Sequence, residues 1–182
     1  MAFLSELPER ATLLDVFGAF PRAAKPLLEY HEAVLRGPSP LSVRDRELIA
    51  AYVSALNACE YCIGVHAATA AAFGLPAATI AALTEDVESA PVDERLKPIL
   101  AYVRKLTRQP ARMTEADAAA VLAAGWDANA LHDAAAICGL FNLMNRLVMG
   151  LGLEADASYF DAASKRLASA DGYRAIVTLL KL

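Results

Sequence analysis

The sequence predicts an all-α protein that folds as a single domain over residues 1–182. Apolar residues recur with helical spacing almost everywhere, and no segment shows the clear alternation of apolar and polar residues that marks a half-buried strand. Proline and glycine fall mainly between the helical segments, and no stretch is long and polar enough to link two domains. A chain of 182 residues is long enough to bury one substantial core.

The helical segments follow from caps and stop signals. A helix from Arg22 to Leu35 ends at Gly37, and the turn-rich sequence GPSPLS follows it. Ser42 is expected to cap the next helix, VRDRELIAAYVSAL, because a serine side chain can accept from the free amides of a first turn. Asn57 is expected to cap a third helix that runs to Phe73 and stops at Gly74. Further helices are expected over Ala77–Glu88, Asp93–Arg108, Thr114–Ala124, Asn129–Met149, Asp156–Ala168 and Gly172–Leu182.

Composition and charge narrow the class of protein. Hydrophobic residues make up 57% of the chain, above the roughly 45–50% of ordinary soluble domains, which predicts surface buried between subunits of a homo-oligomer. The net charge of −4 provides no positive field for nucleic acid or an anionic membrane. The N-terminus does not resemble a signal peptide, and the apolar segment 134–153 is interrupted by Asn142, Asn145 and Arg146. We therefore expect a cytoplasmic protein without nucleic-acid or membrane partners.

Two of the three cysteines and one of the three histidines fall within eight residues of the segment NACEYCIGVH. With Asn57 as the cap, Cys59 and Cys62 would lie in the first turns, where free amides and the helix dipole stabilise negative charge. Both thiols are then expected to ionise more readily than usual. Residues three and four apart share a helix face, so Cys59, Cys62 and His66 form one stripe. The two thiols lie close to disulfide reach, and His66 can take a proton from Cys62.

Glu47 is a candidate third group. It lies on the preceding helix among apolar neighbours, and a break near Asn57 would fold that helix back against the cysteine helix. A buried carboxylate tends to a raised pKa, and in that state Glu47 could store or relay a proton.

These residues carry a family resemblance. The segment RELIAAYVSALNACEYCIGVH resembles the AhpD-like alkylhydroperoxidases of the carboxymuconolactone decarboxylase superfamily, through a Glu, eleven intervening residues, and then Cys-x-x-Cys-x-x-x-His. The later segment AAAICGLFNLMNRLVMGLGL resembles the final core helix of the peroxidase-related branch. The resemblance covers most of residues 41–153, with the redox motif region at 41–74. It implies an AhpD-like helical bundle, oligomeric assembly, and a thiol-dependent peroxidase without haem or metal cofactor.

Carried over residue by residue, the resemblance implies that Cys62 is the peroxidatic thiol and Cys59 the resolving one. His66 would activate Cys62, and Glu47 would feed a proton relay. The substrate would be a hydroperoxide, the reductant a dihydrolipoyl or thioredoxin-like dithiol protein, and the role antioxidant defence. The chain departs from AhpD proteins at Tyr61, where they carry a second histidine. Tyrosine, with an ordinary pKa near 10, is a poor base at neutral pH, so the departure predicts slower turnover or a different oxidant.

Three alternatives remain open at this point. Cys59, Cys62, His66 and Glu47 could bind zinc, although three ligands on one regular helix fit tetrahedral geometry poorly. Cofactor-free decarboxylation or lactone chemistry occurs in the other branch of the superfamily, but that branch has no need of the cysteine pair. A non-catalytic redox sensor would use the same disulfide as a switch. The remaining candidates are interpreted as structural residues, namely His31, Trp126, His132, Cys138, Asn142 and Arg146.

Overall fold

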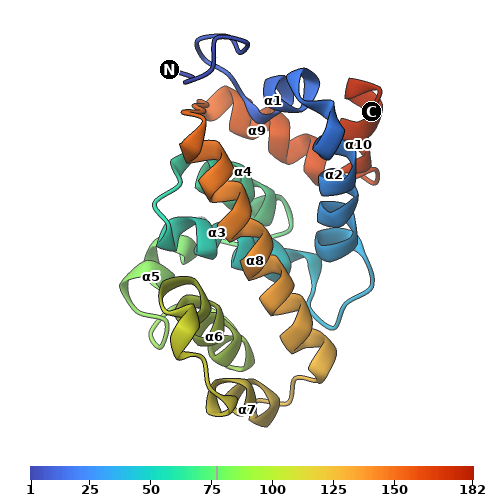
Figure 1. Cartoon of the computed structure of the whole chain (residues 1–182). Coiled ribbons are helices and arrows are strands. Elements are labelled where there is room, and N and C mark those ends of the chain that lie inside the picture. The colour runs from blue at the N-terminus through green and yellow to red at the C-terminus, as the bar shows by residue number, and fades with distance from the viewer. Residues whose placement is uncertain (77) are drawn as a thin grey trace.

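The computed structural model describes residues 1–76 and 78–182, and these residues form helices joined by turns and loops (Figure 1). The all-α fold class is therefore confirmed. Two 3-10 turns, Glu94–Leu96 and Pro110–Arg112, flank the sixth helix. The α-helices are α1 Leu13–Ala19, α2 Pro21–Arg36, α3 Val43–Leu56, α4 Glu60–Ala72, α5 Thr79–Glu85, α6 Lys97–Arg108, α7 Glu115–Ala123, α8 Ala128–Gly150, α9 Ala157–Leu167 and α10 Arg174–Leu180.

Most predicted helix ends agree with the structure because the caps form as expected. The Ser42 hydroxyl accepts a hydrogen bond from the Asp45 amide at 3.1 Å, and α3 spans the residues predicted for it. The segment predicted over Ala77–Glu88 contains the shorter α5, while Ala77 itself lies outside the described residues. The sequence analysis missed α1, although Thr12 and Asp15 form the capping box that begins it.

The prediction that Asn57 caps α4 is wrong. Asn57 instead ends α3, and Cys59 is the N-cap residue of α4. Between them Ala58 takes a positive φ of 55°, which turns the chain sharply. The Asn57 side chain donates to Asn142 at 3.1 Å and to Asn145 at 2.9 Å, so it ties the turn to α8 rather than to the start of α4.

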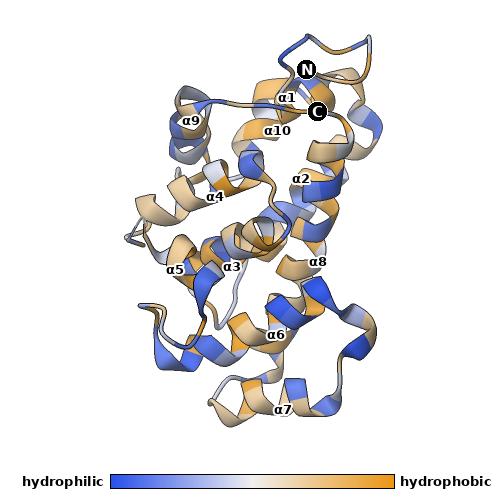
Figure 2. Cartoon of the chain, turned by 90° about the vertical axis from the view of Figure 1, so that its left-hand side faces the viewer, coloured by the Kyte–Doolittle hydropathy of each residue, from blue (hydrophilic) through white to orange (hydrophobic). Residues whose placement is uncertain are grey.

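Helices α3 and α8 occupy the centre of the molecule, with α6 and α7 at one end and α1, α9 and α10 at the other (Figure 1). Almost every residue of α3 from Arg46 to Leu56 is buried. In Figure 2, α4 is coloured mainly as hydrophobic, whereas α6 alternates between hydrophobic and strongly hydrophilic residues around its circumference. This difference fits their positions, because α4 is packed between other helices and α6 has one face toward solvent.

Helix α9 lies across α4 because Gly64 leaves space for it. A Cβ atom at Gly64 would come within 2.3 Å of the Phe160 ring. The contact brings Tyr159 over Tyr61, with the ring centroids 5.4 Å apart. The outer side of the cysteine helix is thereby covered. In the part of the chain that the structure describes, no helix has both the length and the apolar character needed to cross a membrane.

Candidate functional site

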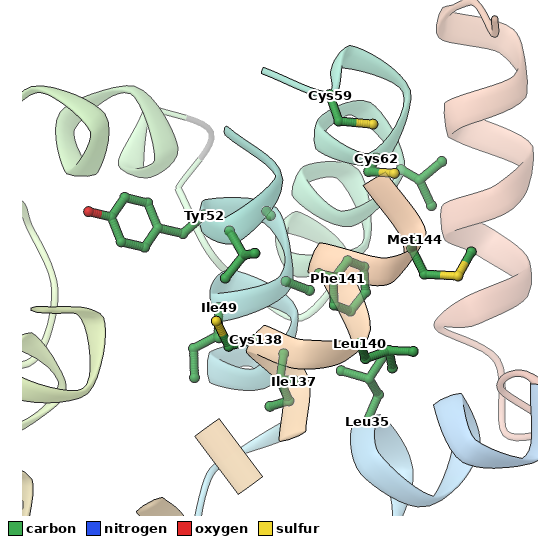
Figure 3. Packing of buried hydrophobic residues seen from close by; sticks show 14 of the residues in the cluster. Leu35, Ile49, Tyr52, Cys59, Cys62, Ile137, Cys138, Leu140, Phe141 and Met144 are labelled. Carbon is green, nitrogen blue, oxygen red and sulfur yellow. The ribbon is translucent and has the colours of Figure 1, made fainter. Parts of the chain in front are cut away.

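The structure places the four predicted site residues on the packed pair α3 and α4 as two contacting pairs, Glu47 with His66 and Cys59 with Cys62. Glu47 lies on α3, Cys62 and His66 lie on α4, and Cys59 immediately precedes α4. All four side chains are buried, and both cysteines are free thiols. Figure 3 shows the side chains of Cys59 and Cys62 at the start of α4, with Cys62 nearer to Met144 of α8.

Glu47 orients the imidazole of His66. Nδ1 of His66 and Oε2 of Glu47 are 2.7 Å apart, and Oε1 of Glu47 lies 2.7 Å from the Arg36 guanidinium. Burial pushes the pKa of Glu47 upward, but His66 and Arg36 outweigh burial and hold this pKa below its ordinary value. The predicted rise in the pKa of Glu47 is therefore wrong. Because Glu47 is a carboxylate that can only accept, Nδ1 of His66 carries the proton and Nε2 remains available as a base.

Arg36 was missed by the sequence analysis. It ends α2, and beyond the ion pair with Glu47 it donates to the carbonyl of Leu167 at 3.0 Å. A basic residue in the last turn is common because it complements the helix dipole, so nothing in the local sequence marks Arg36 as a partner of Glu47. Its role becomes visible only when α2 packs beside α3.

The two thiols differ in their pKa values. The pKa of Cys59 is lowered to about 7, chiefly because the Cys62 thiol donates a hydrogen bond to Cys59. The same hydrogen bond, together with burial, raises the pKa of Cys62. The prediction that both thiols ionise readily thus holds for Cys59 and is wrong for Cys62. In the reduced protein Cys59 is thus the thiol that ionises first, and the hydrogen bond gives the remaining proton a path between the two sulfurs.

Asn145 of α8 also acts on the thiol pair. It is fully buried, accepts from Asn57 at 2.9 Å and donates to the Ser54 hydroxyl at 3.0 Å. Its side-chain amide also hydrogen-bonds the cysteines and lowers the pKa of both Cys59 and Cys62. The signal in the sequence was a pair of amides, Asn142 and Asn145, within the apolar segment 134–153, since a buried amide requires hydrogen-bond partners.

A mainly apolar cavity opens beside Cys62 and His66. The space for the centres of water-sized molecules is about 60 Å³, several times the roughly 10–15 Å³ that one water needs. Cys62 contributes to the wall, whereas Cys59 is absent from the described residues that line it. Of the two sulfurs, Cys62 is thus the one a small molecule in the cavity would meet. The wall also contains Leu13, Phe17, Leu28, His31, Tyr61, Phe141, Met144, Tyr159, Tyr173 and Ile176.

Tyr61 closes the cavity and does not act as a base. Its hydroxyl donates to the hydroxyl of Tyr159 at 2.6 Å and accepts from the Leu13 amide at 3.0 Å. Burial and the neighbouring Tyr159 raise the pKa of Tyr61. Tyr61 therefore links α4 to α1 and α9, at the position where AhpD proteins carry a second histidine.

The sequence favoured a structural role for His31. The residue is indeed buried, but it also lines the cavity. Its Nδ1 lies 2.7 Å from the carbonyl of Leu27, so Nδ1 carries the proton and Nε2 does not. Burial lowers the pKa of His31 to about 4, and a nearby His66 lowers it further while Glu47 opposes the shift. His31 and His66 therefore both line one cavity.

The pKa of His31 predicts a loss of stability in mild acid. Its folded pKa of about 4 lies below the unfolded value of 6.5, so the stabilisation is complete above pH 6.5 and is lost as the pH falls toward 4, by about 3 kcal/mol in all. We expect His31→Leu to flatten the unfolding free energy over this range in urea titrations. A variant that keeps the wild-type slope would contradict the assignment.

The residues proposed for zinc form two pairs, Cys59 with Cys62 and His66 with Glu47. In the described parts of the chain, no three His, Cys, Asp or Glu side chains are arranged to hold a metal ion.

Comparisons with known proteins agree with this fold. The family model of the carboxymuconolactone decarboxylase family matches residues 21–105. A crystal structure of an uncharacterized peroxidase-related protein from Silicibacter sp. TM1040 has 27% identity and a TM-score of 0.75, over 81% of this chain and 78% of that one. A second, titled alkylhydroperoxidase AhpD core, an uncharacterized peroxidase-related protein from Ralstonia eutropha JMP134, shares the fold at 24% identity and a TM-score of 0.74, over 80% and 77%. No curated protein sequence matches the chain.

Fold and site together define an all-helical protein with a buried Cys-x-x-Cys pair beside a His–Glu–Arg chain. The segment that the family model matches contains all five of these side chains. Over residues 21–105 the chain is similar to the carboxymuconolactone decarboxylase family, and it shares its fold with AhpD-like, peroxidase-related proteins.

Proposed function

We propose that this protein is a thiol-dependent peroxidase that reduces hydroperoxides through a dithiol–disulfide cycle of Cys59 and Cys62, in antioxidant defence. The observation that carries the proposal is the position of Cys62. Its sulfur lines an apolar cavity, shares a proton with Cys59 and lies on the same helix face as His66, an imidazole held by Glu47. A nucleophile, a base and an orienting carboxylate are the parts that thiol chemistry needs.

The reaction begins at Cys62. Its proton passes to the Cys59 thiolate or to His66, and the Cys62 sulfur attacks the terminal oxygen of the peroxide. The O–O bond breaks, Cys62 becomes a sulfenic acid, and the departing alkoxide takes a proton to give an alcohol. Cys59 then attacks the sulfenic sulfur and releases hydroxide, which is protonated to water. Two electrons leave the two sulfurs, and the Cys62 proton together with one proton from solvent completes the alcohol and the water.

A dithiol must then reduce the disulfide, and a dihydrolipoyl or thioredoxin-like protein has the required chemistry. Cys59 is 1% and Cys62 is 3% exposed, so an attacking thiolate cannot reach either sulfur without a local opening at the start of α4. We propose that the reductant meets the protein at this junction.

A turnover assay tests the proposal. The purified protein is mixed with hydrogen peroxide, tert-butyl hydroperoxide and cumene hydroperoxide, each with dihydrolipoamide or reduced thioredoxin. We expect multiple turnovers with at least one pair, and a loss of two thiols per chain when the reductant is omitted. Mass spectrometry should place the disulfide between Cys59 and Cys62 and leave Cys138 reduced.

The redox sensor is the one alternative that a specific observation favours, because the burial of both sulfurs slows reduction by an external dithiol. A sensor would lose two thiols once and show no turnover with any dithiol. One equivalent of zinc in protein purified without added metal would instead favour the metal site, and loss of carbon dioxide from a lactone acid would favour the decarboxylase.

A further inference from the structure

Tyr173, just before α10, lines the cavity and has a buried hydroxyl. The residue is 4% exposed, and its hydroxyl has no hydrogen-bond partner among the described residues. A buried hydroxyl without a partner is costly, commonly by about 1–3 kcal/mol in proteins. A hydroxyl of this kind would gain a hydrogen bond from a polar molecule that reaches it.

Two contacts hold Tyr173 in position, and the glycine before it allows the close approach. Its backbone amide donates to Oε2 of Glu32 at 2.9 Å, and the Arg36 guanidinium lies 5.3 Å from the centre of its ring. The preceding Gly172 has φ of +51°, and a Cβ at that position would come 2.7 Å from the Glu32 carboxylate. The hydroxyl thus belongs to a preorganised wall of the cavity.

His31 supplies the complementary group. Its ring centre is 5.0 Å from that of Tyr173, and both side chains line the same cavity. Because the proton of His31 is on Nδ1, its Nε2 can only accept a hydrogen bond. The pair therefore offers one donor and one acceptor within a mainly apolar surface.

We propose that Tyr173 and His31 hold the oxygen-bearing group of the substrate beside Cys62, with Tyr173 donating to it and His31 accepting from it. The proposal rests on the peroxidase function proposed above and assigns two new residues to it. A hydroperoxyl or hydroxyl group has one O–H to donate and oxygen lone pairs to accept, so it satisfies both residues at once. The apolar remainder of the wall receives the carbon part of the molecule.

Tyr173 also acts on the chemistry. When the Cys62 sulfur takes the terminal oxygen, negative charge develops on the oxygen that remains with the carbon part. Burial raises the pKa of Tyr173 well above its ordinary value, so the hydroxyl stays protonated and can donate to that oxygen. Loss of a single preorganised donor to a developing oxyanion commonly costs about 10²–10³-fold in rate.

The experiment varies the leaving group in Tyr173→Phe. Rapid mixing gives the rate constant for the first oxidation of Cys62 with tert-butyl hydroperoxide, which leaves a basic alkoxide, and with peracetic acid, which leaves a weakly basic carboxylate. We expect Tyr173→Phe to slow the first reaction by about 10²-fold or more and the second by much less. Equal losses with both oxidants, or no loss, would overturn the role of Tyr173.

Tyr52→Phe is the matched control. Tyr52 is also a buried tyrosine, but its ring points away from Cys62 to the other side of α3 (Figure 3). We expect this variant to react with both oxidants at wild-type rates. A slowed Tyr52→Phe would assign the effect to general loss of packing.

A binding measurement with tert-butyl alcohol, the product, tests this inference independently of the peroxidase proposal. NMR titration measures its affinity without any turnover, and we expect Tyr173→Phe and His31→Leu each to weaken it by about three- to tenfold. If the wild-type protein reacts with no peroxide but binds the alcohol through these residues, the peroxidase proposal fails and the site stands. If neither variant changes the affinity, the donor–acceptor pair is refuted.

Discussion

Replacement of Cys62 by serine is expected to abolish peroxide consumption altogether. Serine keeps the size and position of the side chain, but its hydroxyl is a far weaker nucleophile than a thiol at neutral pH. Cys59 cannot substitute for it, since Cys59 is absent from the described wall of the cavity. The measurement is the rate of peroxide loss with excess dithiol, and we expect Cys62→Ser to match the protein-free background.

Cys59→Ser provides the comparison. This variant keeps the sulfur that faces the cavity but lacks the resolving thiol, so one equivalent of peroxide should convert Cys62 to a sulfenic acid that a dimedone probe captures. Turnover should stop there. Sustained peroxide reduction by Cys62→Ser, or a sulfenic acid found on Cys59 in the wild-type protein, would reverse the roles of the two cysteines.

Glu47→Ala is expected to cause the largest loss of stability among single substitutions at the site. Glu47 is fully buried and balances the charge of Arg36, whose side chain is 11% exposed, while accepting from His66. Removal of one partner leaves a buried charge uncompensated, which typically costs about 3–5 kcal/mol. Urea unfolding at pH 7 measures the change. Glu94→Ala, which removes an ion pair with Lys97 from a carboxylate that is 82% exposed, should change stability by less than about 1 kcal/mol.

A double substitution distinguishes the ion pair from simple packing. In Arg36→Met with Glu47→Met, neither charge is left alone, so the loss should be clearly smaller than the sum of the two single losses. The pH dependence adds a second check. The folded pKa of Glu47 lies below its ordinary 4.5, so its stabilisation is present above pH 4.5 and is lost as the pH falls through the folded value. Glu47→Gln should lack that acid-dependent loss, and additive single losses would contradict the coupling.

The helices and the redox motif could be predicted from the sequence because both depend on local patterns. Apolar periodicity and the Ser42 cap predicted α3 to the residue, and the spacing of Glu47, Cys59, Cys62 and His66 named the groups that the fold brings together. The turn at Asn57 was misplaced because its side chain has better partners on α8, more than eighty residues later. No pattern near Asn57 contains that information.

The electrostatics of the site depended on contacts between distant segments. The pKa of Glu47 was predicted in the wrong direction because burial was considered without Arg36, which reaches it from α2. The acidity of the two thiols was attributed to a helix end, whereas the hydrogen bond between them makes Cys59 the acidic one. His31 and Tyr173 show no motif at all, and only the folded chain places them in one wall.

The packing of α9 on α4 puts residues from two parts of the chain around one site. The redox groups from Arg36 to His66 lie in the segment that matches the family, whereas Tyr159, Tyr173 and Ile176 come from the last quarter of the sequence. Substitutions of Tyr159 and Ile176 can reshape the space above Cys62 while leaving its redox partners in place. Exchange of residues 157–182 with the equivalent part of a relative should therefore transfer peroxide preference as a module, and directed evolution of selectivity can be confined to those residues.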